Sequence, residues 1–132
     1  MQITNFSYEV IVNDDASTDN TRMVIEKIAS LYPDVIKPVY QHENKYSKGV
    51  RITRDILFPI AQGEYIALCE GDDFWTNPYK LQMQVDALEL HKECNMCLCR
   101  TRVCNENGHM TNMIYPSNAI KTGVIPPEKF LD

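Results

Sequence analysis

The chain has 132 residues, of which 44% are hydrophobic and 23% charged, and its formal net charge is −5. This length suits one domain with a core and is short for two ordinary domains. The acidic balance without any basic block argues against a nucleic acid polymer as partner, because a surface that follows phosphates needs clustered Lys and Arg. No apolar run approaches the roughly 18 residues that span a bilayer, and no signal-peptide pattern opens the chain. We therefore expect a cytoplasmic protein, whose contact with the inner face of the cell membrane would come only through parts outside this chain.

The first third of the chain predicts a strand, a helix and a second strand. "YEVIV" at residues 8–12 is rich in β-branched and aromatic residues, as buried strands are. Ser17, Thr18 and Asp19 are candidates for a helix N-cap, and apolar residues then recur at helical spacing. "DVIKPVYQ" at residues 34–41 predicts a short strand near a sheet edge, because Pro38 has no N–H to donate.

The middle of the chain repeats this alternation after a polar loop, "ENKYSKG", at residues 43–49. Residues 50–61 predict a helix that Pro59 should kink or shorten. "EYIALCE" at residues 64–70 gives the clearest strand prediction in the sequence. Residues 76–92 predict a helix that opens with a capping asparagine and a proline at its first position.

The last part of the chain contains four of the five cysteines. "CNMCLCRTRV" at residues 94–103 predicts another strand, residues 105–132 are loop-rich, and "IPPEKF" at residues 125–130 would start a final helix. An odd number of cysteines without an export signal favours reduced thiols. The single CxxC lacks a second well-spaced ligand pair, so small buried thiols on a strand are favoured over a zinc or redox site.

The resulting order, β-α-β-α-β-α-β, predicts a mainly parallel sheet covered by helices. In such sheets, ligands bind beyond the carboxyl ends of the strands. Two predicted strands run into paired aspartates, Asp14-Asp15 and Asp72-Asp73. We therefore expect the two acidic pairs to lie near each other at one edge of the sheet.

Adjacent carboxylates repel each other, so such a pair calls for a cation or for hydrogen-bond donors nearby. Asp72 and Asp73, with Glu70 just before them, offer the oxygen ligands that Mg²⁺ and Mn²⁺ prefer, and these ions usually bridge to phosphates. The alternative is an acidic turn with capping aspartates. Asp14 and Asp15 could accept hydrogen bonds from a nucleobase or ribose, or could simply cap the helix that follows.

Together, these segments resemble the nucleotide-sugar-binding half of family-2 glycosyltransferases. The family pattern "DD-G/A-S-T-D" is met by "DDASTDNT", and its "ARN" segment by "TRD" at residues 53–55. The pattern "A-x-G-E-Y-I" leading to "D-x-D-D" is met by "AQGEYIALCEGDD", and an aromatic pair with a proline-led helix follows. The resemblance runs from about residue 8 to about residue 104.

This resemblance implies an α/β fold of the GT-A (Rossmann-like) type, a three-layer α/β/α arrangement with a mainly parallel sheet. Residues 1–132 would form a single partial domain, with the nucleotide-binding half at about 8–104 and a loop-rich acceptor-side segment at 105–132. The implied reaction transfers a sugar from a nucleotide-diphosphate donor, often UDP-linked, to a glycan or other hydroxyl acceptor with inversion.

The resemblance also implies roles for single residues. Asp15 would contact the nucleotide base, with Asp14 beside it, and Arg54 would reach the nucleotide. Asp72 and Asp73 would contact the ribose and the Mn²⁺ or Mg²⁺ bound to the diphosphate, with Asp72 favoured as the ligand of the metal. That metal would act as a Lewis acid on the departing nucleoside diphosphate. An Arg54 that is merely solvated remains the alternative from residue type alone.

The chain also departs from the family pattern. Glu70 stands where the family has the first aspartate of "D-x-D-D", and Thr53 and Asp55 flank the arginine. The family's opening strand with "P-x-Y-N" has no counterpart, and Glu128 and Asp132 lack the context of the family's catalytic base. We therefore expect a fragment cut at both ends, whose base lies outside this chain.

Two other functions stay open at this point. The first is a nucleotide- or sugar-binding fragment without transferase activity, which the missing base leaves possible. The second is a Mg²⁺-dependent phosphotransfer domain of the receiver kind, which also ends its first strand with paired aspartates. The second cluster here is a pair and no strand-terminal lysine follows it, so the receiver pattern is matched less well.

Overall fold

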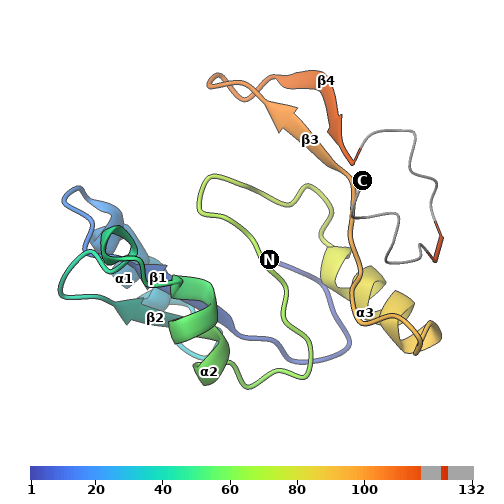
Figure 1. The fold of residues 1–132 in the computed structure, drawn as a ribbon, viewed down its shortest axis with the longest axis horizontal. Coiled ribbons are helices and arrows are strands. Elements are labelled where there is room, and N and C mark those ends of the chain that lie inside the picture. Colours follow the sequence, from blue (N-terminus) through green and yellow to red (C-terminus); the bar gives the residue numbers. More distant parts are fainter. Residues whose placement is uncertain (117–122, 125–132) are drawn as a thin grey trace. The chain divides into compact units, whose positions relative to one another are not determined.

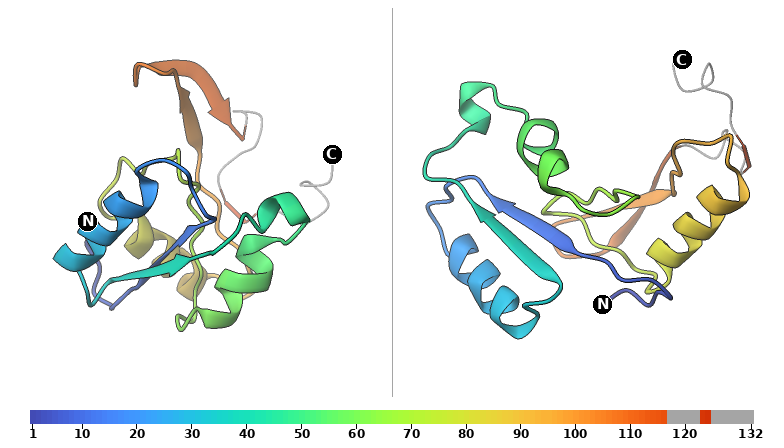
Figure 2. Two further views of the ribbon diagram at one scale, coloured as in Figure 1. Left: turned by 90° about the vertical axis from the view of Figure 1, so that its left-hand side faces the viewer. Right: turned by 90° about the horizontal axis from the view of Figure 1, so that it is seen from below.

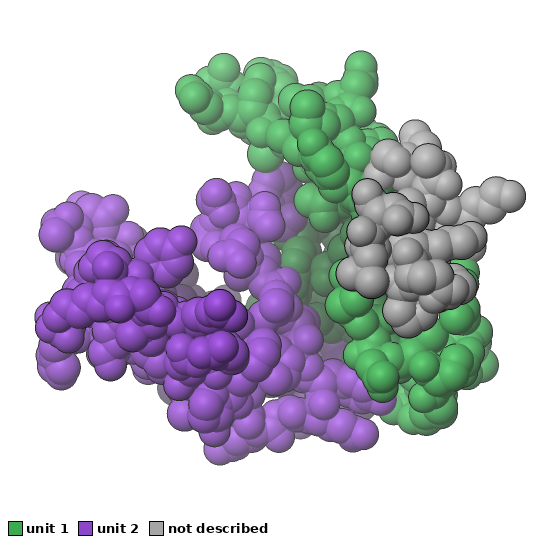
Figure 3. All heavy atoms as spheres, in the orientation of Figure 1, with its two compact units in different colours: residues 1–3, 75–132 green, residues 4–74 purple. Residues whose placement is uncertain are grey.

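The computed structural model describes residues 1–116 and 123–124 of the chain, and Figure 1 shows its helices and strands. The chain forms two compact units (Figure 3): residues 4–74, and residues 1–3 together with residues 75–132. The helix predicted to start within residues 125–130 lies outside the described residues. The expectation of a single partial domain over residues 1–132 stays a prediction.

The unit of residues 4–74 is built on a parallel β-α-β motif. Strand β1 (Val10–Asp14) pairs in parallel with strand β2 (Ile36–Tyr40), with Val10 opposite Ile36 and Asp14 opposite Tyr40. Helix α1 (Thr21–Leu31) makes the crossover between them and lies alongside the two strands (Figure 2). This confirms the prediction for the first third of the sequence, and a parallel sheet with helices is an α/β architecture.

Helix α1 packs as its sequence predicts, but the predicted N-cap is wrong, because the N-cap residue is Asn20, whose side chain makes no capping hydrogen bond. The Oδ1 atom of Asp19, one residue earlier, accepts a hydrogen bond from the backbone N–H of Thr21 at 2.9 Å, so Asp19 stabilises the turn that leads into the helix. Ile25 is 8% exposed and is the buried apolar residue of the part of the chain that the structure describes. The helix ends at Leu31, just before the "YP" pair.

The predicted helix at residues 50–61 is confirmed in a shorter and irregular form. A π-helical turn, η2 (Thr53–Leu57), runs directly into a short α-helical turn, α2 (Phe58–Ile60). Pro59 has no N–H to donate to the carbonyl four residues before it, and its ring crowds that carbonyl. A wider turn before the proline is therefore the expected accommodation.

The strand predicted at residues 64–70 is wrong. Residues 64–73 contain bends, a turn and chain without regular secondary structure, with no partner strand among the described residues. The apolar side chains that should have been buried there are exposed, including Ile66 at 50% and Leu68 at 62%. A strand needs a neighbouring strand edge, and apolar, β-branched composition does not supply one.

The other unit contains helix α3 (Lys80–Leu90), which confirms the predicted helix with a later start. The predicted cap is wrong, because the N-cap residue is Tyr79; the Oδ1 atom of Asn77 accepts a hydrogen bond from the N–H of Tyr79 at 2.9 Å and so closes the turn before the helix. The side chain of Gln2 adds two bonds, accepting from the N–H of Leu81 at 3.0 Å and donating to the carbonyl of Asn77 at 3.0 Å. The first residues of the chain therefore help to fix the start of α3.

The strand predicted at residues 94–103 is largely wrong. Strand β3 (Thr101–Cys104) begins only at Thr101 and pairs antiparallel with strand β4 (Met110–Tyr115), in a region expected to be loop. The turn between them is closed by Asn105, whose Oδ1 accepts from the N–H groups of Asn107 and His109, and by Gly108 at φ 76°. All five cysteines are free, and Cys69 and Cys99 are exposed rather than buried on a strand.

Candidate functional site

The first acidic pair lies at the carboxyl end of β1, and its two carboxylates have different environments. Asp14 is only 2% exposed, and its Oδ1 atom accepts a hydrogen bond from the N–H of Ser17 at 3.1 Å. Its backbone carbonyl accepts from the N–H of Gln41 at 2.9 Å, just beyond β2. Asp14 therefore closes the turn that leads toward α1 and extends the contact between the two strands.

Asp15 holds the loop that follows β2. Its Oδ1 atom accepts a hydrogen bond from the N–H of Lys45 at 3.0 Å, and its Oδ2 atom accepts from the N–H of Tyr46 at 2.9 Å. Because a carboxylate oxygen can accept more than one hydrogen bond, both oxygens keep capacity for a further donor. Asp15 thus brings residues 45–46 to the carboxyl end of β1.

The turn between the two aspartates and α1 has an unusual backbone. Ala16 has φ 61°, the left-handed region, which costs an L-residue roughly 1–2 kcal/mol. The hydrogen bonds of Asp14 to Ser17 and of Asp15 to residues 45–46 lie on either side of this residue. Such strain persists where the surrounding structure fixes the backbone, and it occurs often at ligand sites.

A hydrogen-bonded amide pair with one buried member lies next to the acidic pair, and sequence reasoning missed it. Gln41 is 8% exposed, and its Nε2 atom donates a hydrogen bond to the Oδ1 atom of Asn13 at 3.0 Å. Asn13 is the last residue of β1 before the aspartates, and Gln41 directly follows β2. Polar residues at the carboxyl ends of two adjacent parallel strands were the signal that could have identified this pair.

Arg54 lies in η2, with an ion pair that the sequence comparison did not foresee. Its Nε atom is 2.6 Å from the Oδ1 atom of Asp55, and its side chain is 62% exposed. The Oδ2 atom of Asp55 accepts from the N–H of Arg51 at 3.1 Å. The hydrogen bond to Arg54 lowers the pKa of Asp55 and raises that of Arg54. Since a guanidinium has five N–H donors, Arg54 can hold Asp55 and still offer donors to an anion.

The second acidic pair lies in a turn. The N–H of Asp73 donates to the carbonyl of Glu70 at 3.1 Å, and the Sγ atom of Cys69 lies 3.8 Å from the carbonyl oxygen of Asp73. The side chains of Asp72 and Asp73 are exposed. Within residues 1–116 and 123–124, no three His, Cys, Asp or Glu side chains come close enough together to hold a metal ion by themselves. Two exposed carboxylates do fit an ion that takes its remaining oxygens from phosphate and water, as Mg²⁺ does.

All five residues predicted for the site belong to the unit of residues 4–74. The structure brings Asp15 to residues 45–46 and Arg54 to Asp55. In the described part of the chain, no hydrogen bond joins the first acidic pair to the second. The proximity of the two pairs therefore stays a prediction.

The site residues lie within a region that matches a known family of enzymes. The family model described as glycosyl transferase family 2 matches residues 1–129, nearly the whole chain. The chain belongs to glycosyl transferase family 2. This confirms the resemblance found from "DDASTDNT" and "AQGEYIALCEGDD", and with it the α/β fold class of the GT-A (Rossmann-like) type.

Several curated proteins are similar to this family-2 chain. An uncharacterized protein of Mycobacterium tuberculosis is 44% identical over 107 residues, which are 81% of this chain and 30% of that protein. Two Escherichia coli proteins, WfaP and WfgD, carry the name UDP-Glc:alpha-D-GlcNAc-diphosphoundecaprenol beta-1,3-glucosyltransferase. WfaP is 37% identical over 64% of this chain and 31% of its own length, and WfgD is 29% identical over 86% of this chain and 42% of its own length.

The family-2 chain thus spans about 30% of the length of the mycobacterial relative that it matches. No solved structure matches it. In the part of the chain that the structure describes, no helix has both the length and the apolar character that a membrane crossing requires.

Proposed function

We propose that this chain is the nucleotide-binding part of a metal-assisted, inverting glycosyltransferase that uses a nucleotide-diphosphate sugar. The observation that carries the proposal is the polar rim at the carboxyl end of β1, within a family-2 match over residues 1–129. There, Asp15 draws the backbone of Lys45 and Tyr46 to the strand end while keeping acceptor capacity. Ligands of α/β sheets bind at this edge.

Each predicted residue has a role in this proposal. Asp15 accepts a hydrogen bond from the nucleotide base, while the buried Asp14 keeps the turn in place. Arg54 meets the diphosphate with the donors that Asp55 does not use. Asp72 and Asp73 hold Mn²⁺ or Mg²⁺, with Asp72 as the preferred ligand.

The reaction places two demands on the rest of the site. The acceptor hydroxyl oxygen forms a bond to the anomeric carbon, and the bond from that carbon to the diphosphate breaks with inversion. A general base takes the proton of the hydroxyl, and no residue of this chain is assigned to that task. The metal supplies Lewis-acid stabilisation of the diphosphate when it is bound.

The names of WfaP and WfgD support a more specific proposal for the donor and the acceptor. Both names give UDP-Glc as donor and a diphosphoundecaprenol-linked GlcNAc as acceptor. By this similarity we assign a UDP-linked donor and a sugar acceptor carried on a lipid diphosphate. We also propose that the reaction takes place on the cytoplasmic side, at the inner face of the cell membrane.

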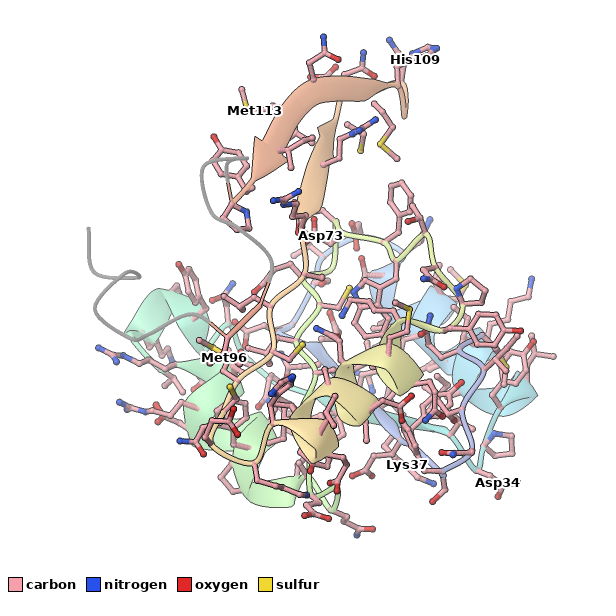
Figure 4. All side chains as sticks on the ribbon, turned by 90° about the vertical axis from the view of Figure 1, so that its right-hand side faces the viewer. Asp34, Lys37, Asp73, Met96, His109 and Met113 are labelled. Atoms are coloured by element: carbon pink, nitrogen blue, oxygen red, sulfur yellow. The ribbon has the colours of Figure 1, made fainter. Side chains whose placement is uncertain are left out.

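Thermal unfolding with UDP, GDP, CDP or ADP, each with and without Mn²⁺, tests the proposal. At a ligand concentration of about 100 Kd, UDP with Mn²⁺ should stabilise the chain by about 2.7 kcal/mol. Asp72→Ala should remove the part of this stabilisation that depends on Mn²⁺. The matched control is Asp34→Ala, an exposed aspartate in the turn between α1 and β2 (Figure 4), which should behave as the wild type does. Absence of stabilisation by every nucleotide, with and without metal, would contradict the proposal.

A further inference from the structure

The β3–β4 hairpin carries an open hollow of about 300 Å³, lined by Arg100, Thr101, Arg102 and Ile114. None of these residues belongs to the nucleotide site described above. We propose that this hollow binds a phosphate or diphosphate group. Its volume is at the small end of the range for ligand sites in proteins, which suits a compact anion better than a whole sugar nucleotide.

Two arginines belong to the lining of the hollow. Arg102 stands opposite Ile114 in the antiparallel register, and directly opposite residues share one face of a sheet. Arg100 lies two residues earlier, just before the start of β3. Both arginines line the hollow, and no carboxylate is among its described lining residues. The planar guanidinium group of Arg102 can offer a pair of N–H donors to phosphate oxygens, and Arg100 adds a second positive charge.

An irregularity beside the hollow is fixed by a side chain. The register of the ladder shifts between Arg102 and Cys104. Thr111 bridges this shift, because its Oγ1 atom donates to the carbonyl of Val103 at 2.8 Å and accepts from the N–H of Met113 at 3.1 Å. Bulges of this kind twist a strand and re-aim its side chains, and they are common beside binding sites. The strand that carries Arg102 is therefore held in its bent form.

The chain segment that lines the hollow differs in charge from the chain as a whole. The whole chain has a net charge of −5, but between residues 95 and 116 the sole acidic residue is Glu106. Glu106 lies in the turn at the far end of the hairpin, whose tip is marked by His109 in Figure 4. An anion is thus repelled by most of the chain and attracted at this position. Ile114 adds an apolar wall, which suits an esterified phosphate with a carbon group attached.

Inorganic diphosphate and the diphosphate of a lipid-linked sugar share the chemistry that the hollow recognises. The anion site itself stands on the hairpin alone. Its assignment to the diphosphate of the acceptor rests on the proposed function. In that assignment, the hairpin holds the lipid-linked end of the acceptor, and the unit of residues 4–74 holds the donor nucleotide.

Titration of the isotope-labelled chain with sodium pyrophosphate, followed by NMR in the presence of EDTA, tests the anion site. We expect saturable shifts at the backbone amides of Arg100, Thr101, Arg102 and Ile114. Arg102→Gln should weaken binding about tenfold, as expected for loss of one charge-assisted pair. Arg102→Lys should weaken it less, because it keeps the charge but loses the planar fork. Arg100→Gln is the second variant if Arg102→Gln fails to fold.

Lys92→Gln is the matched control, since it removes one positive charge from the same unit without altering the hollow. Its affinity for pyrophosphate should stay within about twofold of the wild type. Equal weakening by Lys92→Gln and Arg102→Gln would overturn the proposal, because it would show unspecific charge attraction. Absence of saturable shifts at the four hollow amides would overturn it as well.

Sedimentation with phosphatidylcholine vesicles, with and without a polyprenyl diphosphate, separates the two sources of the anion. Binding only to the vesicles with diphosphate, weakened about tenfold by Arg102→Gln, supports the acceptor assignment. Binding of free pyrophosphate but not of these vesicles overturns that assignment and supports a site for a free anion. Stabilisation by UDP with Mn²⁺ is measured separately, so failure of the hollow and failure of the nucleotide site are distinguished.

Discussion

Asp15 shows how one side chain can serve both the fold and the ligand. Both of its oxygens already accept backbone hydrogen bonds from the loop after β2. This arrangement satisfies two N–H groups and also offsets the repulsion expected between adjacent carboxylates. The alternative interpretation of the sequence was that the aspartate pair only caps the following helix. This does not describe Asp15, because its hydrogen-bond partners lie about thirty residues further along the chain.

Replacement of Asp15 by Asn should therefore destabilise the chain by about 0.5–1.5 kcal/mol, even without ligand. The amide presents one NH₂ group to a backbone N–H, so the N–H of Lys45, which is part-buried, or that of Tyr46, which is exposed, loses its acceptor. Urea unfolding at pH 7 measures the change as a lower midpoint with an unchanged slope. Asp34→Asn, in the exposed turn before β2, is the control and should stay within about 0.5 kcal/mol of the wild type. Equal midpoints for the two variants would show that Asp15 does not hold the loop.

The sequence predicted which residues form the acidic pair but not which of them is buried. Two adjacent aspartates look alike in a sequence, and their environments differ because the backbone turns sharply at Ala16. Glycine in a sequence often indicates a positive φ, whereas alanine does not. The pairing of Arg54 with Asp55 was equally hidden, because the family comparison gave Arg54 a ligand role without considering its neighbour.

Among the helices and strands, local signals were sufficient where the structure depends on near neighbours. Periodic apolar residues predicted α1 and α3, whereas the predicted caps were wrong, because Asp19 and Asn77 form hydrogen bonds in the turns just before these helices and the N-cap residues are Asn20 and Tyr79. The strand predicted at residues 64–70 was wrong because a strand needs a neighbouring strand to pair with, and the local sequence does not show whether one is present. The β3–β4 hairpin was missed because its turn depends on Asn105 and Gly108, which were read as loop.

The hydrogen bonds of Asp19 in the turn before α1 predict a dependence of stability on pH. The side chain of Thr21, and then its backbone N–H, lower the pKa of Asp19 by hydrogen bonding to the carboxylate. Because the pKa is lower in the folded than in the unfolded chain, the stabilisation is present above the unfolded pKa of about 4 and is lost as the pH falls through the folded pKa. Asp19→Asn keeps an acceptor oxygen but cannot titrate, so its stability should fall less between pH 5 and pH 2.

Urea unfolding at a series of pH values between about 5 and 2 measures this difference. Thr21→Val is the companion variant, because it removes the side-chain hydrogen bond that lowers the pKa of Asp19 most strongly. It should also make the acid dependence shallower. An acid profile of Asp19→Asn that runs parallel to that of the wild type would contradict this account of Asp19.

At the scale of the whole molecule, the two proposed sites belong to different compact units. The five nucleotide-site residues lie within residues 4–74, and the hollow is lined by residues of the other unit. Substitutions that share no partner usually have additive effects within about 0.5 kcal/mol. We therefore predict that Arg102→Gln leaves the affinity for UDP with Mn²⁺ within about twofold of the wild type.

Isothermal titration closes this thermodynamic cycle with the double variant Asp72→Ala/Arg102→Gln. Its loss of pyrophosphate affinity in EDTA should equal that of Arg102→Gln alone, and its loss of UDP affinity in Mn²⁺ should equal that of Asp72→Ala alone. A tenfold weaker UDP affinity in Arg102→Gln would contradict the independence of the two sites, because it would mean that residues of both units bind the same diphosphate. In that case the hollow would serve the donor, and the acceptor's diphosphate would have to be bound elsewhere.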